Sequence, residues 1–275
     1  MPLHIQSNNV NMDLQLKGKK AFISGSTQGI GFAVAKRLLE EGTSVVINGR
    51  SEEKVNDAVK RLAETRAGAE ISGIAADFSN PADIARVFEK HPEVDILINN
   101  VAIFEPKPFL EIPDEDWLKF YEVNVMSGIR LSRFYFPKMI AGNWGRVIFI
   151  SSESAINIPE EMVHYGMTKT AQLSVSRGLS ELTRSTGVTV NSILPGPTAS
   201  EGVNTFVEDL AKQQNLSRSE MEEAFFKTAR PTSLIQRFAT PEEIANLVCF
   251  VSSPLASAIN GASLRVDGGV VKSII

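Results

Sequence analysis

Short apolar runs alternate with longer amphipathic segments along most of the chain. Runs rich in β-branched and aliphatic residues predict buried strands, because a parallel sheet covered on both faces needs apolar side chains at successive positions. Such runs occupy residues 21–24, 44–47, 71–75, 96–99, 146–150, 188–194 and 263–266. We therefore predict a sheet of seven strands.

Amphipathic segments between these runs predict helices, one directly after the first strand and others over residues 51–65, 113–143, 165–184 and 241–251. Pro113 suits the first turn of one helix. Thr240 with Glu243 three residues later forms a capping box before another. Strands that alternate with helices in this way indicate the α/β class.

The size of the chain indicates one domain. A chain of 275 residues with 43% hydrophobic types can bury one large core, so we expect a single domain over residues 14–275. Residues 1–13 are expected to be a disordered extension, because residues 1–11 are polar, rich in Asn and without periodicity.

The net charge and the number of cysteines argue against nucleic-acid-binding and disulfide-bonded classes of protein. A formal net charge of -4 offers no basic field, so we expect no nucleic-acid partner. The one cysteine, Cys249, lies in an apolar helical stretch and cannot form an internal disulfide. No apolar run approaches the ~20 residues that cross a bilayer. We therefore expect no membrane association and a cytoplasmic location.

A glycine-rich turn follows the first strand and precedes a helix. It consists of Gly25, Ser26, Thr27, Gln28, Gly29, Ile30 and Gly31. Glycine allows positive φ and the close approach of a diphosphate, while the helix start supplies free N–H groups and partial positive charge. Alone, the turn could be only a tight connection; between a strand and a helix it predicts dinucleotide binding.

A proton-transfer site is predicted after the strand at residues 146–150. Ser152 lies at its carboxyl end, where ligands bind in open α/β sheets. Tyr165 and Lys169 are four apart, so they share one face of a helix. An ammonium beside a phenol favours the phenolate, and Ser152 can hydrogen-bond the oxygen that the phenol serves. This chemistry needs neither histidine nor metal. His164 points about 100° away from Tyr165 on a helix, so we expect it to be a wall or surface residue.

The motifs together resemble the short-chain dehydrogenase/reductase family, in its 3-oxoacyl-carrier-protein-reductase-like branch, over about residues 14–269. The matching motifs are the glycine turn, Asn99-Asn100, Asn124, Ser152, Tyr165 with Lys169, and Pro195-Gly196. The resemblance implies a single-domain Rossmann fold, a doubly wound seven-stranded parallel sheet with helices on both faces. It also implies an NAD(P)-dependent oxidoreductase that moves a hydride between the nicotinamide and a carbonyl or alcohol substrate.

The resemblance assigns roles to the catalytic residues Asn124, Ser152, Tyr165 and Lys169. Tyr165 exchanges the proton, Lys169 lowers the pKa of Tyr165 and binds the ribose, and Asn124 holds a helix kink and a water behind the lysine. Asparagine is a poor former of helix interiors, so its presence in mid-helix indicates a specific role for Asn124. The alternative interpretation is a solvent-facing side chain.

The residues at the end of the second strand indicate whether the cofactor is NADP or NAD. Gly49 stands where NAD-preferring relatives usually carry Asp, and Arg50 follows it. An arginine there can pair with a 2′-phosphate, so the resemblance favours NADP, with NAD possible. Gln28 replaces the basic residue that many NADP-using relatives carry before the second glycine, and Arg50 as a plain surface residue is the alternative.

Further cofactor contacts are implied by the resemblance. Asp77 would reach the adenine, although an N-cap or turn residue is nearly as good an interpretation. Val101 and Ala102 depart from the family's usual Asn-Asn-Ala-Gly, which alters the fit at the ribose. The other expected contacts are Phe78, Asn99, Asn100, Tyr165, Lys169, Pro195, Gly196 and Thr198.

Residues 199–238 take the position of the family's substrate lid, with Phe206, Phe225 and Phe226 at roughly helical spacing; these aromatics could instead cap the core.

The sequence leaves the identity of the substrate open. Ile156 and Ile158 suggest an apolar body, while Glu153, Glu160 and Glu161 suit a polar one. A 3-oxoacyl-carrier-protein reductase is one alternative, but Asn143 and Thr186 stand where the docking cations would fall.

Two different functional classes are less compatible with the chain. A non-catalytic nucleotide-binding regulator would normally lose the tyrosine or lysine, and both are present. An epimerase or dehydratase relative usually has a larger carboxyl-terminal domain. Relatives pair their helices at positions 113–143 and 165–184 across two-fold axes, so a homotetramer, or a dimer, is expected.

Overall fold

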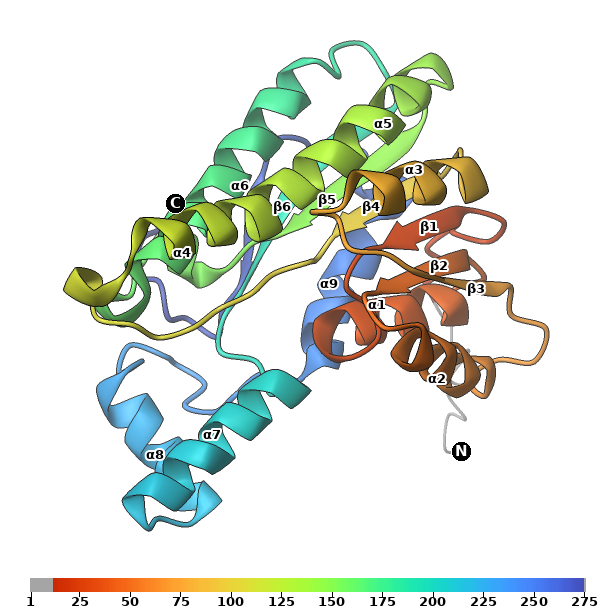
Figure 1. The fold of residues 1–275 in the computed structure, drawn as a ribbon. Helices are drawn as coiled ribbons and strands as arrows, with labels where there is room; N and C mark the ends of the chain where they lie inside the picture. Colours follow the sequence, from red (N-terminus) through yellow and green to blue (C-terminus); the bar gives the residue numbers. More distant parts are fainter. Residues whose placement is uncertain (1–11, 275) are drawn as a thin grey trace, which may run out of the picture.

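The computed structural model describes residues 12–274, except for the side chain of Phe206, and contains a sheet of seven parallel strands (Figure 1). The spatial order is β3-β2-β1-β4-β5-β6-β7. The strands are β1 (Lys20–Ile23), β2 (Ser44–Gly49), β3 (Ile71–Ala75), β4 (Ile96–Asn99), β5 (Gly145–Ile150), β6 (Val188–Pro195) and β7 (Ser263–Val266). This confirms the predicted doubly wound Rossmann fold, and all seven predicted strands are present. Residues 1–11 of the expected extension lie outside the described residues.

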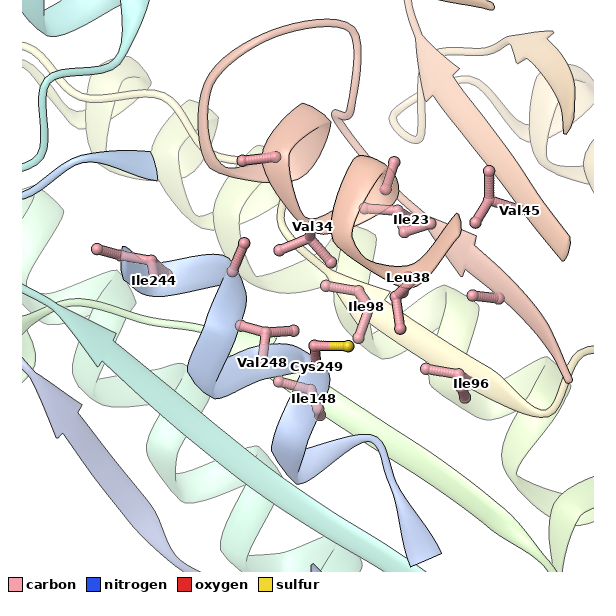
Figure 2. Close-up of a cluster of buried hydrophobic side chains, with 14 of the residues drawn as sticks. Ile23, Val34, Leu38, Val45, Ile96, Ile98, Ile148, Ile244, Val248 and Cys249 are labelled. Carbon is pink, nitrogen blue, oxygen red and sulfur yellow. The ribbon is translucent and has the colours of Figure 1, made fainter. Parts of the chain in front are cut away.

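Helices cover both faces of the sheet (Figure 1). One face packs against α1 (Gly29–Glu40), α2 (Glu52–Ala63) and α9 (Pro241–Val251). Figure 2 shows its core, where Val34 and Leu38 of α1 meet Val248 and Cys249 of α9 above the strands. Cys249 is therefore a core residue, as expected, and burial raises the pKa of its thiol to about 12.

The other face packs against α3 (Pro81–Lys90), α5 (Ser127–Ala141) and α6 (Val163–Glu181). The hydrophobic pattern of the sequence does not predict α3. This helix has ten residues and buries one of them fully, Val87, and ten residues is the lower limit at which a pattern distinguishes a helix from a short strand. Its start signal is nevertheless clear, because the Asn80 side chain accepts a hydrogen bond from the N–H of Ala82 and Pro81 is the first helical residue.

The long helix predicted over residues 113–143 is continuous but contains a π-helical turn. It consists of α4 (Asp114–Tyr121), the π-helical turn Glu122–Met126, and α5. Asn124 lies inside this turn and is 1% exposed. Single π-turns inside α-helices are frequently found at functional sites, and this one separates the outer end of the helix from the part that packs on the sheet.

Two features place the site. The strand order reverses between β1 and β4, and such a switch point opens a crevice at the carboxyl ends of the strands. Helices α7 (Glu201–Gln214) and α8 (Arg218–Thr228) project beyond that edge (Figure 1). Phe226 packs against Phe225 and Phe238 with ring centroids 5.1 Å apart. These aromatics form a separate small core with α7 and α8 and do not cap the sheet. Residues 199–238 are called the lid below, and their role as a substrate lid stays a prediction.

Candidate active site

A cavity of about 800 Å³ runs along the carboxyl edge of the sheet, from the glycine turn to the base of the lid. Most of the predicted site residues line it: Gly25, Thr27, Gln28, Gly29, Ile30, Arg50, Asp77, Phe78, Asn100, Val101, Ser152, Tyr165, Lys169, Pro195, Gly196 and Thr198. Residues from the ends of β1, β2, β3, β4, β5 and β6 therefore meet in one space. A cavity of this volume is typical of small-molecule and cofactor sites.

The glycine turn has the geometry that an extended anionic cofactor needs. Gly25 and Gly29 have φ of 62° and 60°, a region that residues with a Cβ rarely adopt. Asn48 holds the turn in place, because its Oδ1 accepts from the Gly25 N–H at 3.2 Å and its Nδ2 donates to Ala76 O at 3.2 Å. The turn leads directly into the amino end of α1, so the residues present fit a dinucleotide's diphosphate.

Three predicted cofactor residues lie behind the cavity wall. Ser26 is fully buried and donates to Ile23 O at 2.6 Å. Asn99 is 3% exposed, and its Nδ2 donates to Ser132 Oγ at 3.2 Å. A Cβ on Gly31 would come within 2.6 Å of Asn100 Nδ2. The structure does not bring these three to the cavity; they fix the shape of its wall.

The end of β2 presents cations and no carboxylate. A Cβ on Gly49 would lie 2.6 Å from Thr27 Cγ2, so a larger residue there would require Thr27 to move. Arg50 is exposed at the cavity, and among residues 12–274 no hydrogen bond or ion pair to it is found. Lys54 of α2 lines the same part of the cavity. Two cations therefore flank this end.

Asp77 belongs to a turn. Its Oδ1 accepts from both the N–H and the hydroxyl of Ser79, at 2.9 and 2.7 Å, and these bonds, with Arg50 nearby, lower the pKa of Asp77. The N-cap of the following helix is Asn80. The turn interpretation therefore holds, and Asp77 still faces the cavity.

Ser152 and Tyr165 lie together at the carboxyl end of β5. Ser152 is 8% exposed and accepts the N–H of Ser154 at 3.1 Å. Burial raises the pKa of Tyr165 to about 12, and a hydrogen bond with Ser152 opposes this rise. Tyr165 is therefore a protonated phenol at neutral pH, in contact with a hydroxyl that shares its cavity.

Lys169 is buried beside Tyr165. Its Nζ lies 5.6 Å from the centre of the Tyr165 ring and donates to Ile150 O at 2.9 Å. Burial lowers the pKa of Lys169 to about 7. The net effect on Tyr165 is a raised pKa, with burial as its largest cause, and the expected lowering of this pKa by Lys169 stays a prediction. Both groups lose solvation on burial, which favours the neutral phenol and the neutral amine alike.

Asn124 connects the π-helical turn to α6. Its Oδ1 accepts from the Ile103 N–H at 2.7 Å, and its Nδ2 donates to Thr168 Oγ1 at 3.0 Å. Gln172 Nε2 donates to Asn124 O at 2.6 Å, and Gln172 Oε1 accepts from Lys169 Nζ at 3.4 Å. The solvent-facing alternative for Asn124 is wrong, because the side chain is fully used inside the protein.

His164 is neither a surface residue nor part of the cavity wall. It is 1% exposed and packs between helices, with its ring centroid 4.0 Å from that of Phe120. Burial lowers the pKa of His164, which favours the uncharged imidazole.

The far end of the cavity carries charged side chains. Glu153 and Glu161 line it together with Arg230, which follows α8. Ile156 and Ile158 do not line it and are 43% and 45% exposed, so the apolar substrate surface expected from them is absent there. The apolar lining comes instead from Met221, Phe225 and Phe238 of the lid and from residues outside it such as Phe104 and Met162.

Comparison with known proteins identifies the family. A family model described as enoyl-(acyl carrier protein) reductase matches residues 25–271, nearly the whole described chain. The chain belongs to the short-chain dehydrogenase/reductase family. It is thus an oxidoreductase by family, and the predicted resemblance is confirmed.

Similar members of this family extend over the full chain. The uncharacterized oxidoreductase YvaG of Bacillus subtilis (strain 168) is 52% identical over 96% of this chain and 100% of its own length. The 3-oxoacyl-[acyl-carrier-protein] reductase FabG of Aquifex aeolicus (strain VF5) is 30% identical over 94% and 100%. L-Sorbose reductase from Gluconobacter frateurii, solved with NADPH and L-sorbose, is 30% identical over 96% and 100%, with a TM-score of 0.89.

The described helices include none that is long and apolar enough to cross a membrane. The cellular compartment stays a prediction.

Sequence reasoning misses three residues of the site. Arg230 pairs with Glu153 across 77 residues, and no local pattern signals that contact. Glu201 reaches Gly29 across 172 residues. Lys54 could have been found, because it lies four positions after Arg50 at the start of a helix that Ser51 caps.

Proposed function

We propose that this protein is an NADP-dependent reductase or dehydrogenase that moves a hydride between the nicotinamide and a carbonyl or alcohol carbon. The observation that carries the proposal is the meeting of Ser152, Tyr165 and Lys169 in the cavity that also holds the glycine turn and Arg50. These groups come from several different elements, so their convergence in one space is a property of the whole fold.

In the reducing direction Ser152 donates a hydrogen bond to the carbonyl oxygen of the substrate, and Tyr165 gives its proton to that oxygen. Tyr165 suits this step because it keeps its proton at neutral pH. The cofactor, when bound, supplies the hydride and thereby the redox chemistry. In the oxidising direction Ser152 and Tyr165 hold the alcohol oxygen, and Tyr165 receives the proton.

Lys169 and Asn124 support the proton transfer. Lys169 has a pKa near neutrality, so it can gain or lose a proton at little cost. Its Nζ is linked through Gln172 to the Asn124 backbone. The Asn124 side chain in turn fixes Thr168, one residue before the lysine. This network holds Lys169 beside Tyr165, and its ammonium form can also bond the ribose hydroxyls.

NADP is favoured over NAD by the end of β2. Among residues 12–274 the Arg50 guanidinium has no hydrogen-bond or ion-pair partner, Lys54 adds a second cation, and Gly49 has no carboxylate to hold a 2′-hydroxyl. The structure of the L-sorbose reductase relative contains NADPH, which agrees with this choice. NAD remains the alternative cofactor.

Reduction of 3-oxoacyl groups on a carrier protein is less well supported. The A. aeolicus relative has that activity by name. In this chain the expected docking positions are Asn143 and Thr186, which carry no charge. Asn143 lies between α5 and β5, and Thr186 lies between α6 and β6.

A panel of carbonyl and alcohol compounds tests the proposal. Purified protein is mixed with each compound and with NADPH, NADH, NADP or NAD, and nicotinamide absorbance is followed. The panel includes ketoses, hydroxyketones, simple ketones and a 3-oxoacyl thioester. We expect NADPH-dependent reduction of at least one carbonyl compound. Cofactor binding without turnover on any member of the panel would favour the nucleotide-binding regulator.

A further inference from the structure

Gln172 is a buried polar side chain on the face of α6 that carries the proton-transfer pair. It is 2% exposed and lies three residues after Lys169 and seven after Tyr165. Residues at these spacings share one face of a helix. Glutamine is mostly found exposed, so the contacts of a fully buried one beside this pair indicate what it does.

Both ends of the Gln172 amide are hydrogen-bonded. Its Nε2 donates to Asn124 O, in the π-helical turn, at 2.6 Å, and its Oε1 accepts from Lys169 Nζ at 3.4 Å. A backbone carbonyl oxygen can only accept, so the amide nitrogen must face Asn124 and the amide oxygen must face Lys169. The π-helical turn therefore fixes Gln172 as an acceptor toward the lysine.

The surroundings of Lys169 make this acceptor important. Burial lowers the pKa of Lys169 to about 7, and burial is the only cause of this change. The partners of its Nζ are two uncharged acceptors, Ile150 O at 2.9 Å and Gln172 Oε1. The charged side chains of neighbouring elements act on other groups: Glu153 and Arg230 on Tyr165, and Asp116 of α4 on His164.

An acceptor at Nζ favours the charged lysine. Hydrogen bonds from an ammonium are stronger than those from a neutral amine, so each acceptor stabilises the ammonium form. When Tyr165 gives its proton to the substrate it becomes a phenolate, and a nearby ammonium stabilises that phenolate. The ammonium form of Lys169 therefore serves the reduction, and the two acceptors oppose the loss of its proton.

We infer that Gln172 is a positioning residue, which takes its orientation from the π-helical turn and holds Lys169 as an ammonium beside Tyr165. This inference rests on the proposed function and adds a residue to it. It also gives the π-helical turn a task in the reaction, because the turn presents the Asn124 carbonyl that orients the amide.

An NMR titration tests the inference without a substrate. The protein is made with 13C-labelled lysine, and the Cε signal of Lys169 is identified by its absence in Lys169→Met. This signal is titrated in the wild type and in Gln172→Met, which keeps the length of the side chain and removes the amide. We expect the variant to lower the pKa of Lys169 by about one pH unit, because a hydrogen bond to a charged group is lost. An unchanged pKa would overturn the inference.

Two further variants make the titration specific. Ser176→Ala removes a buried polar group one turn after Gln172 on the same helix, and it should leave the pKa of Lys169 unchanged. Gln172→Glu keeps an acceptor at this position, so the pKa of Lys169 should lie at or above that of the wild type. It provides a second reading if Gln172→Met does not fold. A pKa that falls in Gln172→Glu would also contradict the inference.

The pH dependence of kcat for NADPH-dependent reduction connects Gln172 to the reaction. We expect the fall of kcat at high pH to begin about one pH unit lower in Gln172→Met, which gives a loss of about 10-fold on that limb and little loss at low pH. A kcat lowered by the same factor at every pH would indicate a structural role only and would overturn the inference. If the protein reduces no carbonyl compound, the proposed function fails, and the NMR titration alone decides whether Gln172 holds the ammonium.

Discussion

The Glu201 carboxylate accepts a hydrogen bond from the Gly29 backbone N–H at 2.7 Å. Gly29 is the first residue of α1 and Glu201 the first residue of α7, so the lid touches the amino end of the cofactor helix. Ser200 is also close, because its Cβ would lie 3.2 Å from a Cβ on Gly29. An anionic side chain thus occupies an N–H of the glycine turn, where a dinucleotide's diphosphate would fit.

Replacing Glu201 should therefore strengthen cofactor binding. Glu201→Gln removes a negative charge that competes with the diphosphate, and charges at a helix end typically contribute ~0.3 to 2 kcal/mol. We expect the Kd for NADPH to fall by roughly 2- to 10-fold in a fluorescence titration. Glu208→Gln, on the exposed part of the same helix, is the control and should bind as the wild type does. Unchanged or weaker binding in Glu201→Gln would mean that the carboxylate does not compete.

Arg50 and Lys54 should both discriminate between the two cofactors. Hydrogen bonds to charged groups contribute ~1.5 to 3 kcal/mol, or about 10- to 100-fold in Kd. Gln28 supplies no further cation, so we expect Arg50→Ala to raise the Kd for NADPH by about 10-fold and Lys54→Ala by less. NADH binding should change little in either variant. Lys60→Ala, an exposed residue of α2 outside the cavity, controls for general charge. An equal rise in the Kd values for NADPH and NADH would show that these residues do not contact the 2′-phosphate.

Lys169 should make stability depend on pH above neutrality. Its pKa is about 7 in the folded protein and 10.5 in the reference state. Between these values the unfolded chain binds one proton more than the folded chain, so the free energy of unfolding rises with pH. The cost of burying the ammonium is complete below pH ~7 and is relieved as the pH rises to ~10.5.

Denaturant titrations of the wild type and Lys169→Met at several pH values measure this effect. We expect the wild type to gain up to about 1.4 kcal/mol per pH unit relative to the variant above pH ~7. Lost hydrogen bonds to Ile150 and Gln172 give a constant offset and do not alter the slope. A difference that stays flat from pH ~6 to ~9 would show that the lysine keeps its proton.

The sequence predicts the fold well because local and global signals agree. Buried parallel strands such as β4, whose four residues are all buried, are apolar runs in the sequence. The capping box of Thr240 and Glu243 forms as predicted. Helix α3 is not predicted because it has only ten residues, the lower limit at which a pattern distinguishes a helix from a short strand.

The candidate site is predicted less completely, and the reason is distance along the chain. The glycine turn and the Tyr165–Lys169 spacing are local patterns, so they are visible in the sequence. The pairing of Glu153 with Arg230 depends on how the lid returns to the sheet. The pKa values are hidden for a similar reason, because they are set by burial and not by the identity of the neighbouring residue alone.

Assembly into a homotetramer stays a prediction. Leu118 on α4 and Leu182 at the end of α6 are 69% and 65% exposed, and both belong to the helices expected to pair. Burying such side chains between subunits would remove apolar surface from water. Light scattering at micromolar concentration should give the mass of four chains, or of two for a dimer. A monomer would contradict the prediction.

Tyr165→Phe tests the central claim most directly, because it removes only the transferable proton and leaves the ring in place. General acid catalysis contributes ~10²- to 10⁴-fold, so we expect kcat for carbonyl reduction with NADPH to fall by at least about 100-fold. The Kd for NADPH, measured by fluorescence on the same preparation, should stay close to that of the wild type. Turnover within a few-fold of the wild type would contradict the assignment of Tyr165 as the proton donor.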